Sequence, residues 1–216
     1  MLWLVRHGES LANAGGVPTT DYAAIPLTDR GRAQAEAVAA ACREAPAWIG
    51  RSPYLRALQT AAPLLARYPE SPALDLPIHE FTYLAESRVA MDAVARQPMV
   101  DAYWARMDPD HRDGDGAETF ADLHGRARAF LREAAGRAGF GVVFTHEQFI
   151  RAVLVAAMYP GEAPSVGLMR RFFALRGGMP IPNAAVVRMR WDAGRWWSGG
   201  VDVSHLRAAE PGEPAP

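Results

Sequence analysis

The chain has 216 residues, of which 50% are hydrophobic and 22% are charged, as is typical of a soluble globular protein with one substantial core. Its formal net charge of −1 and pI near 6.6 provide no field that would attract nucleic acid or an anionic membrane, so any anion site must be local. All 23 basic residues are arginine, which excludes lysine Schiff-base chemistry, a pyridoxal phosphate anchor and a Walker phosphate loop.

Cysteine usage and the opening residues indicate where the protein works. The single cysteine, Cys42, excludes a disulfide framework and a cysteine-based zinc cluster, and its place among alanines predicts a core residue. No basic leader opens the chain, and no apolar stretch approaches membrane length. We therefore expect a cytoplasmic protein.

Hydrophobic patterning predicts strands that alternate with helices in the first half of the chain. A Gly/Pro/Thr-rich loop over 14–26 separates the first strand from the first helix, whose start is marked by Thr28. The expected elements, in chain order, are a strand over 2–5, a helix over 28–43, a strand over 47–50, a helix over 54–68 and a strand over 76–80.

The second half continues this pattern after an insertion. Residues 81–117 hold helical stretches broken by Pro98 and Pro109, and the spacing of Asp115 and Glu118 predicts a capping box at the start of the next helix. The expected elements that follow are a helix over 118–137, a strand over 141–145, a helix over 146–158 and a hairpin of strands over 184–191 and 195–203.

The alternation of strands and helices predicts an α/β fold. We expect a three-layer α/β/α sandwich with a mostly parallel central sheet and a helical insertion over the active site. We expect one domain over residues 1–206, in which 81–117 and 161–182 are lids or specificity insertions. The segment 207–216 is expected to be a disordered tail.

Two buried strands are each followed by a histidine, the first by Arg6-His7-Gly8 and the later one by Thr145-His146. Because the carboxyl ends of parallel strands meet at one edge of a sheet, where open α/β folds bind ligands, we expect the two imidazoles to lie side by side. Arg56, in the first turn of its helix, adds a cation that suits a bound dianion, and Asn13 can donate an amide hydrogen. Each residue alone is more typical of a structural or surface role; together they predict an anion-binding active site.

The same residues belong to sequence blocks whose order carries a family resemblance. The blocks are Leu4 to Ser10 with Asn13, Pro26 to Gly31 with Gln34-Ala35, Ser52-Pro53 to Ala61, Val142 to His146 with Ile150-Arg151 and, more weakly, Pro182-Asn183. With these blocks, the chain resembles the histidine phosphatase superfamily, which includes cofactor-dependent phosphoglycerate mutase. The first block is fairly specific, and the complete ordered set is very specific.

The resemblance implies a role for each matching residue. His7 is the expected nucleophile, which attacks phosphorus to form a phosphohistidine, and Arg6, Asn13, Arg56 and His146 are expected to hold the phosphoryl oxygens. Cations at Arg6, Arg56 and a protonated His146 would lower the pKa of His7 and favour its nucleophilic form. Because arginines neutralise phosphoryl oxygens without a metal, we expect neither a metal nor another cofactor.

The family also supplies a carboxylic acid that protonates the leaving group. Glu80 fits best, because it follows an apolar segment and lies 24 residues beyond Arg56; Glu86 is the competitor. A general acid at this place needs its pKa raised by burial. The plainer interpretation of Glu80 is a surface carboxylate at the end of a strand.

Two departures from the family pattern bear on the reaction. Glu147-Gln148 follow His146 where the family usually has glycine, and we expect the Glu147 side chain either to turn away or to meet a cationic part of the substrate. The segment 81–84 replaces a glycine-bearing segment of the mutases, whose longer insertion is also missing. The replaced segment and the missing insertion both favour a phosphatase over a mutase.

The sequence thus predicts a metal-independent phosphatase that hydrolyses a small phosphorylated metabolite, with neither nucleic acid nor membrane as a partner. Three alternatives stay open: a phosphoglycerate mutase, an inactive phosphate-binding regulatory module, and a metallohydrolase that uses His7, His79 and His146. A homodimer also stays open. The substrate is not indicated, since specificity is expected from residues 81–117 and 161–182.

Overall fold

The computed structural model describes residues 1–15, 21–89 and 91–207, and within these ranges six strands form one sheet in the order β3-β2-β4-β1-β5-β6. β1 to β4 run parallel, whereas β5 pairs antiparallel with β1 and β6 antiparallel with β5. The prediction of a mostly parallel sheet is confirmed. The strands are β1 (Leu2–Arg6), β2 (Trp48–Arg51), β3 (Ala73–Asp75), β4 (Gly141–Thr145), β5 (Val186–Asp192) and β6 (Arg195–Asp202).

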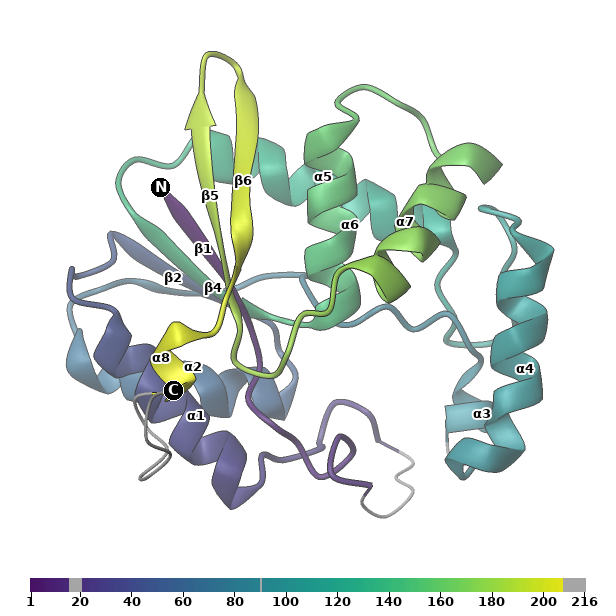
Figure 1. Cartoon of the computed structure of the whole chain (residues 1–216), viewed down its shortest axis with the longest axis horizontal. Coiled ribbons are helices and arrows are strands. Elements are labelled where there is room, and N and C mark those ends of the chain that lie inside the picture. The colour runs from purple at the N-terminus through teal and green to yellow at the C-terminus, as the bar shows by residue number, and fades with distance from the viewer. Residues whose placement is uncertain (16–20, 90, 208–216) are drawn as a thin grey trace, which may run out of the picture.

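Helices cover both faces of this sheet, which confirms the predicted three-layer α/β/α sandwich (Figure 1). α1, α2 and α8 lie on one face, α5 and α6 lie on the other, and α7 packs against α6. α3 and α4, from the predicted insertion, stand apart from the sheet. The helices are α1 (Asp29–Ala41), α2 (Leu55–Arg67), α3 (Glu86–Val89), α4 (Ala93–Arg106), α5 (Phe120–Ala135), α6 (Glu147–Met158), α7 (Val166–Gly178) and α8 (Ser204–Arg207).

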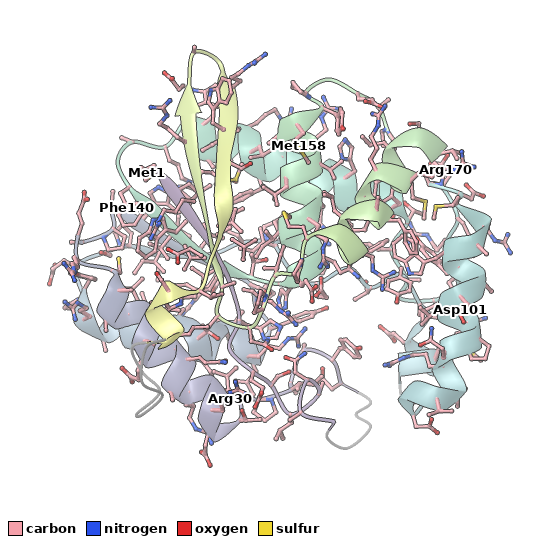
Figure 2. All side chains as sticks on the ribbon, in the orientation of Figure 1. Met1, Arg30, Asp101, Phe140, Met158 and Arg170 are labelled. Atoms are coloured by element: carbon pink, nitrogen blue, oxygen red, sulfur yellow. The ribbon has the colours of Figure 1, made fainter. Side chains whose placement is uncertain are left out.

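Strand side chains alternate between two apolar cores, one on each face of the sheet. In β1, Leu2 and Leu4 pack with residues of α5 and α6, and Val5 packs with residues of α1 and α2. Side chains fill the space on both faces (Figure 2). Cys42, which is 1% exposed, belongs to the second core, as predicted. β4 is buried along its whole length because helices cover both of its faces.

The third strand lies earlier in the chain than predicted. It spans Ala73–Asp75 and pairs with β2, whereas the prediction placed it at 76–80. Leu76 still donates its backbone N–H to Arg51, but Pro77 has no N–H to offer and Ile78 donates to Leu76 instead, so the chain leaves the sheet. Glu80 therefore lies in a loop and not at the end of a strand.

The predicted capping box of α5 was also misplaced. Thr119 caps the helix and Asp122 reciprocates, so that the box lies further along the chain than the predicted Asp115 and Glu118. Glu118 instead pairs with Arg126 at 2.6 Å. Two residue pairs with suitable spacing compete for the cap here, and the one that directly precedes the apolar stripe of the helix forms it.

Parts of two predictions lie outside the described residues: the loop over 14–26 at 16–20, and the expected tail at 208–216. Arg207 ends α8. Along the parts of the chain that the structure describes, no helix is both long enough and apolar enough to cross a membrane. The assignment of residues 1–206 to one domain stays a prediction.

Candidate active site

His7 lies at the carboxyl end of β1 and is 3% exposed. Its backbone N–H donates to the carbonyl of Thr145 (2.9 Å), and its ring centroid lies 5.1 Å from that of His146, so the two imidazoles are side by side. Its Nδ1 lies 2.7 Å from the carbonyl oxygen of Gly8 and therefore carries the proton that it donates. Nε2 is left as an acceptor, and Arg56 Nε donates to it at 3.2 Å.

The surroundings of both histidines favour the neutral imidazole. Burial, followed by the charges of Arg56 and Arg6, holds the pKa of His7 well below its usual range. Burial and Arg56 do the same to the pKa of His146, which disfavours the protonated form that would add a cation. His146 Nε2 lies 2.8 Å from Ser52 Oγ, while its buried Nδ1 has no hydrogen-bond partner within the described ranges.

Arg56 is held by aromatic rings and by a backbone carbonyl. Only 4% of it is exposed, and its guanidinium lies 4.9 Å from the ring centroid of Tyr54 and 5.9 Å from that of Tyr22. Its Nη1 also donates to the Tyr22 carbonyl at 2.7 Å. Weak hydration of the guanidinium makes such a buried, stacked position tolerable, and the rings fix the plane of the group beside His7.

Glu80 reaches the same sheet edge from its loop. Its Oε1 accepts from the backbone N–H groups of Phe81 (2.9 Å) and of Gln148 (3.1 Å), the latter in the first turn of α6. Burial raises the pKa of Glu80 despite these bonds. Glu86, the competing candidate, is exposed at the start of α3 in the insertion.

Asn13 is exposed and lies close to the backbone carbonyl of His7, because Asn183 contacts both groups. Its Oδ1 accepts from Ser10 N–H (3.2 Å) and from Asn183 Nδ2 (3.0 Å), which leaves its own amide hydrogens as the group able to meet an anion. Asn183 Nδ2 and the backbone N–H of Ala184 both donate to the carbonyl of His7, at 3.2 and 3.1 Å. The segment before β5 therefore holds the end of β1 in place.

Two glycines let the loop after β1 pack against the start of α1. A Cβ on Gly31 would lie 2.0 Å from the carbonyl oxygen of Glu9, and one on Gly8 would lie 2.4 Å from the carbonyl oxygen of Gly31. Thr28 Oγ1, the cap of α1, donates to Glu9 Oε1 at 2.8 Å. Close backbone contact thus explains why the first two sequence blocks occur together.

The expectation that the Glu147 side chain turns away from the site is wrong, whereas its contact with a cationic part of the substrate stays a prediction. Its carboxylate bridges two arginines, with Arg6 Nη1 at 3.0 Å and Arg151 Nη2 at 2.5 Å. Arg6 Nη1 also donates to the carbonyl of Ile181 at 2.5 Å. The side chain that replaces the family's glycine therefore acts as the counter-ion of a predicted phosphate ligand.

The three histidines of the metallohydrolase alternative are not arranged as metal ligands. Within the described ranges, no group of three or more His, Cys, Asp or Glu side chains is placed to hold a metal ion. His79 stacks on the ring of Tyr54, with centroids 5.8 Å apart. Burial lowers the pKa of His79.

A model of a known protein family matches nearly the whole sequence. The model of the histidine phosphatase superfamily (branch 1) matches residues 2–201, and the chain belongs to this family. No curated protein matches the sequence.

Solved structures share the fold at low sequence identity. A putative α-ribazole-5′-P phosphatase from Escherichia coli is 19% identical, with a TM-score of 0.69 over 94% of this chain and 95% of that chain. A phosphoserine phosphatase variant from Entamoeba histolytica, in complex with phosphoserine, is 17% identical, with a TM-score of 0.67 over 95% and 98%. A mycobacterial glucosyl-3-phosphoglycerate phosphatase is 23% identical, with a TM-score of 0.65 over 94% and 96%.

Several side chains around the site had no role assigned from the sequence. Three of them lie in the sequence blocks, but spacing does not show what they contact. Ser52 contacts His146, Tyr54 contacts Arg56, and Asn183 contacts the His7 carbonyl. Arg151 is 2% exposed and lies within the buried run 149–156 of α6, whose other members are apolar. An arginine inside the buried stripe of a helix is a signal of an internal counter-ion, and Glu147 lies one turn before it.

Proposed function

We propose that the protein is a metal-independent phosphatase that hydrolyses a small phosphorylated metabolite through a phosphohistidine on His7. The observation that carries the proposal is the state of the His7 ring: Nδ1 donates to Gly8, and Nε2 accepts from Arg56. This neutral imidazole has its lone pair on Nε2, the nitrogen that faces a cation, as attack on a phosphoryl dianion requires. Membership of the family and the phosphatase names of its structural neighbours support a phosphate ester as the substrate.

The first step transfers the phosphoryl group to the protein. The His7 Nε2 lone pair forms a bond to phosphorus while the ester P–O bond breaks, and the leaving oxygen takes a proton from Glu80. The raised pKa of Glu80 keeps that proton available at higher pH than for an ordinary glutamate. Arg6, Asn13, Arg56 and His146 hold the phosphoryl oxygens in this proposal.

The second step releases phosphate. The Glu80 carboxylate accepts a proton from water as the water oxygen bonds to phosphorus, and the P–N electron pair returns to Nε2. His7 and Glu80 thereby regain their starting protonation states, so that each cycle consumes one water and no other reactant.

Replacing His7 tests the proposal. The variant His7→Ala should release no inorganic phosphate from a panel of sugar phosphates, phosphoglycerates, nucleotides and phosphoproteins. The variant His111→Ala removes an imidazole of the insertion, which packs against Tyr103, and should keep the activity. Turnover that survives in His7→Ala overturns the proposal. Phosphoglycerate interconversion without phosphate release would assign a mutase instead, and phosphate binding without turnover a regulatory module.

A further inference from the structure

A cavity of about 570 Å³ is lined by Tyr22 and Tyr54, whose rings contact Arg56, and by residues of the helical insertion. Its lining is rich in rings, contributed by Tyr22, Tyr54, His79, Phe81 and Tyr83. A volume of this order accommodates a group much larger than a three-carbon acid.

The cavity begins where the leaving group of the ester must lie. Tyr22 and Tyr54 both lie against the guanidinium of Arg56. The walls of the cavity therefore include the rings that flank the proposed phosphate site. His79 and Phe81, which flank Glu80 in the chain, also line it. The group that leaves with a proton from Glu80 therefore extends into this space.

The chemistry of the lining favours a flat ring. Two arginines, Arg96 and Arg176, and two acids, Asp21 and Glu86, balance in formal charge, so the lining does not select a second anionic group. Aromatic side chains bind planar π systems by offset or edge contacts. Tyr83 is itself fixed by rings, with centroids 4.8 Å from Tyr103 and 5.3 Å from Phe81, and therefore offers a preorganised surface.

We propose that the substrate is a phosphate monoester whose alcohol part carries a planar aromatic ring, and that this ring binds in the cavity lined by Tyr22, Tyr54, Phe81 and Tyr83. The inference rests on the proposed phosphatase function and names the substrate class of that same site. It predicts that the ring itself raises kcat/KM, independently of the chemistry of the ester bond.

Matched substrate pairs test the inference in the wild-type protein. Adenosine 5′-monophosphate and ribose 5-phosphate differ mainly by the base, and 2-phenylethyl phosphate differs from butyl phosphate mainly by the ring. We expect kcat/KM to be about tenfold higher for the ring-bearing member of at least one pair. Equal values in both pairs overturn the inference, even if phosphoserine or phosphoglycerate is hydrolysed. If the protein hydrolyses none of these esters, the proposed function itself fails.

Variants of Tyr83 locate the ring. Tyr83→Leu keeps apolar volume but removes the π surface, and it should lose most of the preference for the ring-bearing member of each pair. Tyr83→Phe should keep the preference, and so should Trp197→Ala, which removes an aromatic side chain that is 50% exposed on β6. A preference that survives in Tyr83→Leu, with folding verified by thermal denaturation, overturns the assignment of the ring to this cavity.

Discussion

The carboxylate of Glu147 bridges two guanidinium groups, and we expect its removal in Glu147→Gln to destabilise the fold. The side chains of Arg6 and Arg151 are only 13% and 3% exposed, so an amide at position 147 leaves buried cations without a counter-ion. Breaking a buried ion pair by removing one partner costs about 3–5 kcal/mol. Because the Glu147 side chain is 28% exposed and glutamine keeps one acceptor oxygen, we expect a loss of about 2 kcal/mol.

Thermal unfolding measures this loss against a matched control. For a protein of this length, about 2 kcal/mol corresponds to a Tm that is lower by about 4–8 °C. Glu133→Gln removes the same kind of i,i+4 pair with an arginine, but there the Arg137 and Glu133 side chains are 30% and 51% exposed. The control should change the stability by less than about 0.5 kcal/mol. Equal shifts in the two variants would refute the reasoning.

The same variant should bind phosphate more tightly. Glu147 places a negative charge next to Arg6, and its repulsion of a phosphate dianion, if about 1 kcal/mol, corresponds to about fivefold in the binding constant. The inhibition constant of inorganic phosphate should therefore fall by about this factor in Glu147→Gln. A constant that rises or stays the same would show that Glu147 does not offset the charge of the pocket.

Three further predictions concern the acid, the histidines and a helix cap. Glu80→Gln should lower kcat/KM about 100-fold for alkyl phosphates but much less for p-nitrophenyl phosphate, whose leaving group needs no proton, and it should remove the fall in kcat/KM of the wild type as pH rises through the raised pKa of Glu80; equal losses of kcat/KM on both substrates contradict the role of Glu80 as the acid. Folding lowers the pKa values of His7 and His146, so their contribution to the free energy of unfolding is present above the unfolded pKa of about 6.5 and is lost as pH falls below it. The Tm of the wild type should therefore decline from pH 7 to 5 more steeply than that of His7→Asn. Identical slopes would contradict this. Thr119→Ala should lower the free energy of unfolding by about 1 kcal/mol through loss of the α5 cap, whereas Thr119→Ser should leave it nearly unchanged; a wild-type Tm in Thr119→Ala would show that the cap contributes little.

The sheet edge could be predicted because parallel strands pair in a regular register. Once two apolar strands each end in a histidine and lie next to each other, register alone brings the imidazoles together, and Arg6 indeed lies opposite Thr145. The third strand was misplaced because an apolar run that contains proline resembles a strand, while a three-residue edge strand is too short to show a period. Glu80 still lies near the predicted sheet edge, since its choice rested also on its separation from Arg56, and its role as the acid stays a prediction.

The bridge made by Glu147 and the aromatic cavity could not be predicted. The spacing of Glu147 and Arg151 on one helix suggests a pair, but the approach of Arg6 depends on the tertiary placement of α6 beside β1. The cavity combines rings from segments whose relative position depends on loops, and loop conformation is weakly encoded in a hydrophobic pattern. The catalytic roles of the site residues stay predictions.

The contacts that hold the end of β1 also order events during protein synthesis. Arg6 and His7 emerge from the ribosome long before the carbonyl that binds Arg6, which belongs to Ile181, 175 residues later, and before Asn183 and Ala184. A nascent chain that ends before residue 181 cannot fix Arg6 and His7 as the finished protein does. The end of β1, where the candidate site lies, is therefore completed only after the segment before β5 has been translated.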